Sequence, residues 1–366
     1  MMIVITVILL LVIYLAAFLK RPQFGKVASG DRLERIKGSP NYRDGKFQNL
    51  NPTRDLTEGV SYFKVLKDVI FNKSATVRPP YVLPSLKTDL LNLSRDEDVL
   101  IWFGHSSYFI QIDKKRILVD PIFSGRSSPV KFTTKSYKGS DVYQVEDIPE
   151  IDYLFISHDH WDHLDYETIT KLRPKIGKVI TGLGTGAHLE HWGYPPEMIT
   201  ELDWYQEQSL DPGFKVNATP ARHFSGRALT RNQVLWMSFV LTTPSMKIYL
   251  GGDSGYDAHF SEIGNLYGPI DLAILECGQY DKNWKYIHMM PDEIIRAVQD
   301  LKAKTLLPVH WAKFALAQHA WDEPISNVTD QCQKTNIPVL HPLIGEKVNL
   351  KSVKVYDKWW LKIPTL

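Results

Sequence analysis

A short stretch, ISHDHWDHLD at residues 156–165, places three histidines and three aspartates directly after the apolar residues YLF. A short apolar run of this kind is typical of a buried β-strand. Neutral imidazole and carboxylate oxygen are ligands of zinc and similar cations, and His158 and His160, two positions apart after a strand, can point at one ion. Asp162 and His163 continue the same turn and can face a second ion. We therefore expect a fold that brings further ligands to the end of this strand.

A helix-capping loop is the simpler interpretation of the same stretch. Asp165 precedes a helical pattern at 166–172, and an aspartate at such a position accepts a hydrogen bond from a free backbone N–H group. Capping accounts for Asp165 but requires none of the three histidines. The HxHxDH pattern is also rare by chance. We therefore predict that the HxHxDH residues at 158–163 bind metal.

Strand-like and helical patterns follow one another from residue 98 onward. Apolar runs typical of strands lie at 99–104, 107–113, 116–123, 153–157, 178–181, 215–221, 235–243, 246–252 and 271–278. Helical patterns lie at 166–172 and 291–302, and the second opens with Pro-Asp-Glu, as the first turn of a helix prefers. Strands in two blocks, each followed by helices, predict an α/β fold of two packed sheets flanked by helices, with polar residues on loops at one edge.

Several separate motifs resemble those of one known superfamily. The HxHxDH pattern is similar to the signature of the metallo-β-lactamase superfamily, whose fold is an αββα sandwich of two mixed sheets. More narrowly, IWFGHSSYFIQIDKKRILVDPIFSGRSSPV (101–130), GGDSGYD (251–257), GPIDLAILECGQY (268–280) and LPVHWAKFALAQHAWDEP (307–324) resemble the N-acyl-phosphatidylethanolamine-hydrolysing phospholipase D family. Sugar-lactone hydrolases are more distant relatives. The resemblance covers residues 98–345 and implies the αββα sandwich for this chain.

The resemblance implies two metal ions and seven ligands. The first ion would be held by His158, His160 and His223, the second by Asp162, His163 and His310, and both by a bridging Asp253. The three ligands outside the HxHxDH pattern each follow an apolar run, where a ligand at a sheet edge is needed. We expect two Zn²⁺ ions from the ligand type, and iron or manganese would also accept nitrogen and oxygen ligands.

Other polar residues are candidates for supporting roles. We expect Asp162, Asp253 and His288 to be catalytic residues that orient the nucleophile or carry its proton. His105 and His288 lie in stretches that match the family, and either can line the pocket without binding metal. Asp120 either accepts the N–H of a ligand histidine or caps the turn that follows it.

The remaining histidines and several aromatic residues lack such a context. We expect structural or surface positions for His188, His191, His259, His319 and His341. Candidates for an acyl-chain groove, with core packing as the alternative, are Trp192, Tyr194, Trp204, Tyr205, Trp284 and Tyr286.

The resemblance implies a metal-dependent hydrolase. Two cations about 3.5–4 Å apart can lower the pKa of a shared water toward neutrality and present hydroxide to a phosphodiester. On the phospholipase D interpretation, the substrate is an N-acyl-phosphatidylethanolamine-like lipid, and the products are an N-acylethanolamine and phosphatidic acid. The alternatives are a hydrolase of lactone or other carboxylic bonds, and a catalytically silent membrane-anchored module.

The N-terminal segment IVITVILLLVIYLAAFL, residues 3–19, holds no charged residue and is at the short end of what crosses a bilayer. Lys20 and Arg21 follow it. A cleaved signal peptide is the alternative, but no basic residue precedes the run and no A-x-A-like cleavage site ends it. We expect a single-pass anchor, and the positive-inside rule places the rest of the chain on the cytoplasmic side. A tethered domain is close to lipid head groups, which favours a lipid substrate.

The chain therefore divides into three predicted parts: an anchor at 1–21, an extension at 22–97 that wraps the catalytic domain, and the catalytic domain at 98–366.

A net charge of +2, with 43 basic and 41 acidic residues, gives no indication of nucleic-acid binding. Cys277 and Cys332 are the only cysteines and have no CxxC spacing, so the sequence suggests neither a disulfide framework nor a thiolate zinc site. The expected partners are a phospholipid substrate and a membrane, and the sequence leaves open whether the protein is a monomer or a homodimer.

Overall fold

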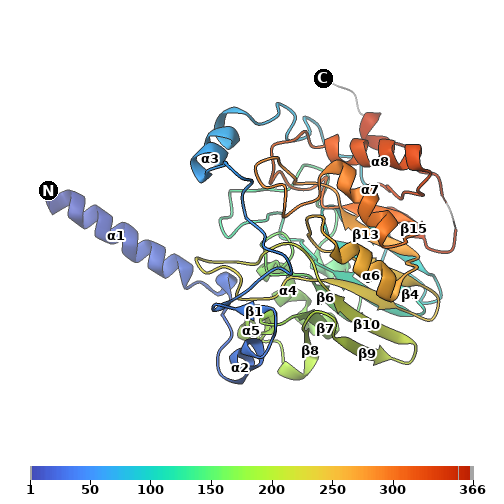
Figure 1. Cartoon of the computed structure of the whole chain (residues 1–366), viewed down its shortest axis with the longest axis horizontal. Coiled ribbons are helices and arrows are strands. Elements are labelled where there is room, and N and C mark those ends of the chain that lie inside the picture. Colours follow the sequence, from blue (N-terminus) through green and yellow to red (C-terminus); the bar gives the residue numbers. More distant parts are fainter. Residues whose placement is uncertain (1, 353, 363–366) are drawn as a thin grey trace.

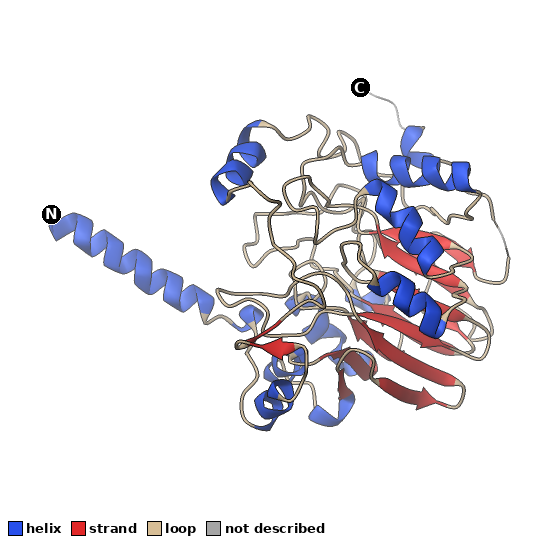
Figure 2. Ribbon diagram, in the orientation of Figure 1, coloured by secondary structure: helices blue, strands red, loops and turns tan. Residues whose placement is uncertain are grey.

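Two β-sheets pack face to face between helices in the computed structural model, which describes residues 2–352 and 354–362 (Figure 1, Figure 2). In order across the first sheet, the strands are β15 (Lys347–Asn349), β3 (Val99–Trp102), β4 (Tyr108–Ile112), β5 (Lys115–Val119), β6 (Ile151–Ile156), β7 (Ile176–Gly182) and β8 (Ile199–Leu202). The second sheet runs β14 (Leu306–Val309), β13 (Leu272–Glu276), β12 (Lys247–Leu250), β11 (Ser238–Thr242), β10 (Phe214–Thr219) and β9 (Glu207–Asp211). A separate hairpin joins β1 (Tyr42–Arg43) and β2 (Lys46–Phe47).

Helices cover the outer face of each sheet. The α-helices are α1 (Met2–Leu19), α2 (Asp31–Lys37), α3 (Tyr62–Phe71), α4 (Tyr166–Leu172), α5 (Thr185–His191), α6 (His259–Tyr267), α7 (Pro291–Asp300) and α8 (Glu323–Thr335). Short 3-10 helices lie at Pro22–Phe24, Val145–Asp147, Arg173–Lys175, Pro196–Met198 and Trp359–Leu361. The first sheet packs against α4 and α5, and the second against α6, α7 and α8. The predicted α/β class with two mixed sheets and flanking helices is confirmed, and the layering agrees with the expected sandwich.

Strand β6 shows why its sequence is apolar at nearly every position. Side chains alternate between the two faces of a strand. Tyr153 and Phe155 enter the core between the sheets, whereas Leu154 and Ile156 belong to the cluster that packs under α4. A strand buried on both faces needs apolar residues throughout, so the run ends where the backbone leaves the core.

The direction of the strands decides where the polar residues gather. In the first sheet β5 and β6 are parallel, and β3 points the same way because it is antiparallel to β4, which is antiparallel to β5. In the second sheet β12, β13 and β14 are parallel, and β10 shares their direction through the antiparallel β11. The carboxyl ends of strands that run the same way lie at one edge of their sheet. Residues that follow β3, β5, β6, β10, β12 and β14 are thereby brought to one edge of the sandwich.

The strands predicted from the sequence are all present, with ends that differ by at most four residues. Helix α4 begins and ends as predicted, and α7 ends at Asp300, two residues early. The elements not predicted from the sequence include β9, whose residues are only partly buried at the sheet edge. They also include α3, whose apolar residues face outward.

The segment between α1 and β3 contacts the two-sheet part of the chain. Arg32 forms ion pairs with Glu190 and Glu201, and Arg95 forms one with Asp152. Helix α1 itself projects away from the sandwich (Figure 1), and none of its residues is buried. By length and composition it is one helix able to cross a bilayer. The division of the chain after residues 21 and 97 stays a prediction.

Replacing Phe155 by alanine tests the packing between the sheets. The ring is fully buried and meets Phe239 of β11 edge-on, with ring centroids 5.1 Å apart. Removing it leaves a cavity between two sheets that cannot close over it, so we expect Phe155→Ala to lower the free energy of unfolding by about 3–5 kcal/mol. Urea unfolding of the detergent-solubilised protein measures this change. The matched control Leu266→Ala, at an exposed position of α6, should change it by less than about 0.5 kcal/mol; equal losses would contradict the packing argument.

Candidate metal centre

The predicted ligands meet at the edge of the sandwich where these strands end. His158 and His160 follow β6, His223 follows β10, Asp253 follows β12 and His310 follows β14. All seven predicted ligands belong to groups whose ligand atoms lie within 4.8 Å of one another. The two sheets therefore bring the predicted ligands together at one shared site.

The first group consists of three imidazoles. His158 Nε2 lies 2.9 Å from His160 Nδ1, which lies 3.2 Å from His223 Nε2. Tetrahedral zinc with nitrogen ligands at 2.0–2.1 Å places neighbouring ligand atoms about 3.3 Å apart. The spacing of these three nitrogens thus suits a single cation between them. The same distances allow N–H···N hydrogen bonds between neutral imidazoles, and three rings that converge in this way supply the nitrogen ligands that such a cation needs.

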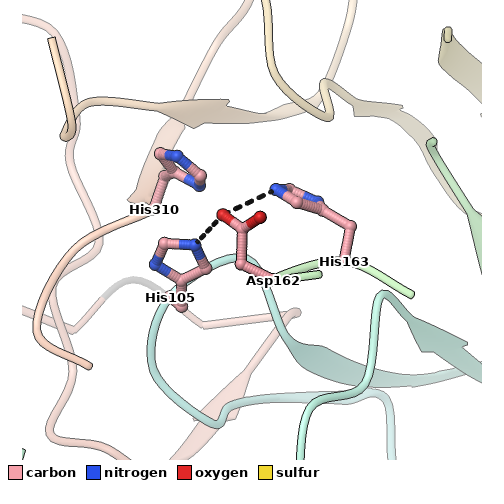
Figure 3. Close-up of side chains that lie close together, drawn as sticks. All are labelled: His105, Asp162, His163 and His310. Atoms are coloured by element: carbon pink, nitrogen blue, oxygen red, sulfur yellow. Dashed lines mark hydrogen bonds and ion pairs between the residues drawn. The ribbon is translucent and has the colours of Figure 1, made fainter. Parts of the chain in front are cut away.

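The second group contains Asp162, His163 and His310, together with His105 (Figure 3). Asp162 Oδ2 lies 2.8 Å from His105 Nε2 and 3.6 Å from His163 Nε2. His105 is fully buried and its ring packs 4.0 Å from that of His310. The sequence had left His105 without a definite role, and the structure places it on the Asp162 carboxylate.

Asp253 lies between the two groups. Its Oδ2 is 3.1 Å from His163 Nε2, 3.7 Å from His223 Nε2 and 3.9 Å from His158 Nε2. Its other oxygen, Oδ1, is 3.2 Å from His310 Nδ1. One carboxylate therefore reaches ligands of both predicted ions, which is the position required of a bridge.

The protonation of this cluster fits a cation. Burial lowers the pKa of His158 and His223 well below the usual range and that of His160 to about 4, so these imidazoles are neutral at pH 7. Neutral imidazole is the form that binds metal. Burial raises the pKa of Asp253 to about 6, and the neighbouring His163 opposes this rise. Among the described residues, neither His163 Nε2 nor Asp253 Oδ1 has a hydrogen-bond partner. The donors present thus fit one or two divalent cations.

Asp120 holds one of the predicted ligands in place. Its Oδ2 lies 2.8 Å from His163 Nδ1 and accepts a hydrogen bond from Ser157 Oγ at 2.6 Å, while its Oδ1 accepts the Ser157 N–H at 2.9 Å. His223 is oriented in a similar way, because its Nδ1 lies 2.8 Å from the carbonyl oxygen of Ile287. Such contacts fix the ring and leave the opposite nitrogen free for metal.

Three residues at this edge adopt backbone conformations that L-amino acids avoid. His105, Asp120 and His310 have φ values of 52°, 40° and 69°. Each such conformation costs about 1–2 kcal/mol relative to the right-handed region. Reciprocal hydrogen bonds maintain two of them: His310 N–H donates to the carbonyl of His105 at 2.9 Å, and His105 N–H donates to that of Trp311 at 2.8 Å. Strain at strand ends that carry reactive side chains is typical of functional sites.

Glu276, the last residue of β13, was not identified from the sequence. It is buried, accepts the backbone N–H groups of Ser254 and Met289, and lies 2.5 Å from His288 Nδ1. Burial raises the pKa of Glu276 well above its usual range. The ring of His288 in turn lies 5.0 Å from that of His223. A charged residue at the end of the apolar run LAILE was the signal that could have revealed it.

A cavity of about 390 Å³ opens beside the cluster. Five of the predicted ligands and His288 line it, and its other walls include Leu56, Tyr62, Phe224, Trp284, Ile287 and Leu316. Of the six aromatic residues considered for an acyl-chain groove, only Trp284 lies here. Trp192, Tyr194 and Trp204 are buried in the core instead, so the packing alternative is correct for them.

The histidines expected outside the site do lie outside the metal cluster. His188 Nδ1 accepts the N–H of Lys26, and His319 Nε2 accepts that of Gln279. Asp165 does cap α4, because its side chain accepts the N–H of Glu167 at 3.2 Å. Capping therefore explains this one residue of the stretch 156–165.

The chain shares sequence features with a known protein family. A family model described as the beta-lactamase superfamily domain matches residues 115–311, which is more than half of the chain and includes all seven predicted ligands. The chain belongs to the metallo-β-lactamase superfamily. As a superfamily member with a buried cluster of histidines and aspartates, it is a metal-dependent hydrolase by family. The resemblance inferred from the motifs is confirmed.

Individual relatives agree with this assignment. An uncharacterised protein of Mycobacterium tuberculosis is 37% identical over 326 residues, which cover 88% of this chain and 87% of that protein. The N-acyl-phosphatidylethanolamine-hydrolyzing phospholipase D 1 of Caenorhabditis elegans is 29% identical over 228 residues, which cover 59% of this chain and 64% of that enzyme. A solved metallo hydrolase from Ignicoccus hospitalis has a TM-score of 0.53 at 22% identity and covers 69% of this chain and 97% of that one. The last likeness shows the fold alone.

Exchanging Asp120 for asparagine tests the support of the second group. Both oxygens of Asp120 face hydrogen-bond donors, so an amide must turn its N–H₂ group toward another donor. We expect Asp120→Asn to reduce metal affinity by about 10–100-fold without unfolding the protein. Metal content after dialysis against graded chelator concentrations measures the loss. The control is Asp98→Asn, another buried aspartate that accepts a backbone N–H from Asp113; metal loss from both variants alike would contradict a specific role.

Proposed function

We propose that this protein is a phosphodiesterase of the phospholipase D type, which cleaves N-acyl-phosphatidylethanolamine-like lipids to N-acylethanolamine and phosphatidic acid. The observation that carries the proposal is the cavity beside the predicted ligands. It combines a polar floor of histidines and aspartates with a wall of Leu56, Phe224 and Leu316. A lipid presents a charged phosphodiester next to long apolar chains, and this cavity offers a matching surface to each part. The likeness to the nematode phospholipase D supports the same substrate class.

The chemistry assigned to the site begins with the ligands. When bound, two cations would activate a water molecule and neutralise charge on the phosphate oxygens. His158, His160 and His223 would hold one of them, and Asp162 or Asp253 would accept the proton of the attacking water.

His288 would act on the substrate from a position beside the predicted ligands His223 and His310. It lines the cavity, and its ring is fixed through the contact between Nδ1 and Glu276. An imidazole oriented by a carboxyl group is suited to hydrogen bonding and proton transfer at its other nitrogen. His288 is therefore proposed as the residue that contacts the phosphate or the leaving oxygen, with Glu276 as its positioning residue.

Helix α1 would hold the enzyme at its substrate. The helix is apolar along its whole length, exposed, and followed by Lys20 and Arg21. We assign it as a single-pass anchor, with the catalytic domain on the cytoplasmic side by the positive-inside rule. Confinement to the membrane would raise the local concentration of a lipid substrate above that of a diffusing one.

The direct test is turnover of defined substrates by the zinc-loaded, detergent-solubilised protein. We expect release of N-acylethanolamine from N-acyl-phosphatidylethanolamine, and loss of at least about 100-fold in kcat/KM for His310→Ala, because a ligand at the second group is gone. The matched control His191→Ala changes an exposed histidine outside the cluster and should leave activity unchanged. Full activity and full metal content in His310→Ala would contradict the ligand assignment. Turnover of lactones with none of phosphodiesters would replace the proposed substrate by a carboxylic one.

A further inference from the structure

Helix α3 carries its apolar residues on the outside. Six of its ten residues are large, apolar and between 44% and 76% exposed, namely Tyr62, Phe63, Leu66, Val69, Ile70 and Phe71. A helix on the surface of a soluble protein has the opposite arrangement, with its apolar face turned to the core. Contiguous exposed apolar groups of this kind mark an interaction surface.

Polar contacts hold the inner face of α3 against the catalytic part of the chain. Asp68 is the buried residue of the helix, and its Oδ2 accepts hydrogen bonds from Asn283 Nδ2 at 3.1 Å and from Lys64 Nζ. Lys64 Nζ also donates to Asn283 Oδ1 at 3.1 Å. Ser61 caps the first turn by accepting the N–H of Lys64. The orientation of α3 is thus set by a specific polar attachment, which keeps its apolar face turned outward.

Helix α3 lies on the side of the molecule from which α1 projects (Figure 1). The loop 128–132 lies beside α1, since Val130 and the 79% exposed Phe132 share a pocket with Tyr14 and Phe18 of that helix. Aromatic side chains gather at the interface between lipid and water. The apolar surface that begins on α1 therefore continues onto the sandwich at this side.

Charge around α3 favours the same partner. Between residues 61 and 78 the chain has four basic residues and one acidic residue. Basic residues beside an apolar helical face attract anionic lipid head groups. A helix with an apolar face and flanking lysines is suited to lie in the plane of the interface, about 5–10 Å into the boundary of head groups and acyl chains.

The first residue of α3 also borders the metal centre. Tyr62 and Leu56, just before the helix, line the same cavity as His160, Asp253 and the other predicted ligands. A lipid that leaves the bilayer beside α3 would meet the cavity without crossing open water.

We propose that α3 is an interfacial helix: its apolar face inserts into the bilayer that α1 enters, and it sets the mouth of the metal cavity against the lipid surface. This inference rests on the proposed membrane attachment and lipid substrate. It adds a second contact that fixes the orientation of the domain and names the route by which the lipid enters.

Site-specific fluorescence in the full chain tests the insertion. Cys277 and Cys332 are buried, so a cysteine introduced at the surface can be labelled selectively with an environment-sensitive fluorophore. The labelled variants Ile70→Cys on α3 and Leu266→Cys on α6 are matched, since the native side chains are 56% and 57% exposed. In vesicles of phosphatidylcholine and phosphatidylserine, lipids brominated on the acyl chain should quench the probe at residue 70 and leave that at residue 266 unchanged. Equal quenching, or none, at these two positions overturns the inference.

A third label separates this inference from the proposed anchor. The variant Leu10→Cys on α1 should be quenched if α1 enters the bilayer; quenching there with none at residue 70 leaves the anchor and removes the role of α3. None of these measurements needs turnover, so failure of the proposed hydrolase activity is detected independently.

Kinetics tests the route of entry. Phe63 and Ile70 are exposed and do not line the cavity, so Phe63→Ser/Ile70→Ser leaves the predicted machinery intact. We expect the apparent KM for vesicle lipid to rise about 10-fold or more, because two apolar side chains no longer insert, while kcat/KM for a short-chain soluble analogue is unchanged. An unchanged KM for vesicle lipid contradicts the proposed route.

Discussion

The proximity of imidazoles and carboxylates at one buried edge is the constraint on which this structure depends. Asp253 Oδ2 lies within 3.9 Å of nitrogens from His158, His163 and His223. Polar atoms that are buried without a hydrogen-bond partner, as His163 Nε2 and Asp253 Oδ1 are among the described residues, are unfavourable unless a further partner compensates them. A divalent cation does so for both kinds of ligand at once. Metal binding is therefore expected to stabilise the fold as well as to serve the chemistry.

The strands and the surrounding side chains are arranged to make this edge rigid. Strands of common direction in both sheets end here, and left-handed backbone conformations at His105, Asp120 and His310 turn the chain at those ends. Asp120 and Ile287 then contact the outer nitrogens of His163 and His223. Because each ring is held from behind, the inner nitrogens point at a common space.

The segment that follows α1 is joined to this same edge. The guanidinium of Arg227 lies 4.0 Å from the ring centroid of Trp161, within the HxHxDH loop, and donates hydrogen bonds to the carbonyls of Gln23 and Asp159. Phe24 packs edge-on against Trp161 at 5.3 Å. The segment that follows α1 is thereby fixed to the loop that carries four predicted ligands. An anchor attached in this way would orient the cavity relative to the bilayer rather than merely tether the domain.

The sequence by itself determined the local features. The strand ends, the cap at Asp165, the HxHxDH loop and the uncharged N-terminal segment depend on residues near one another in the chain, so periodicity and spacing reveal them. Resemblance supplied His223, Asp253 and His310, which local patterns alone would not have separated from structural residues. Only the tertiary structure placed His105 on Asp162 and Glu276 on His288, because these contacts depend on the order and direction of strands far apart in sequence. It also decided that the apolar face of α3 points outward, since an amphipathic pattern shows that one face is apolar but not which surroundings that face will meet.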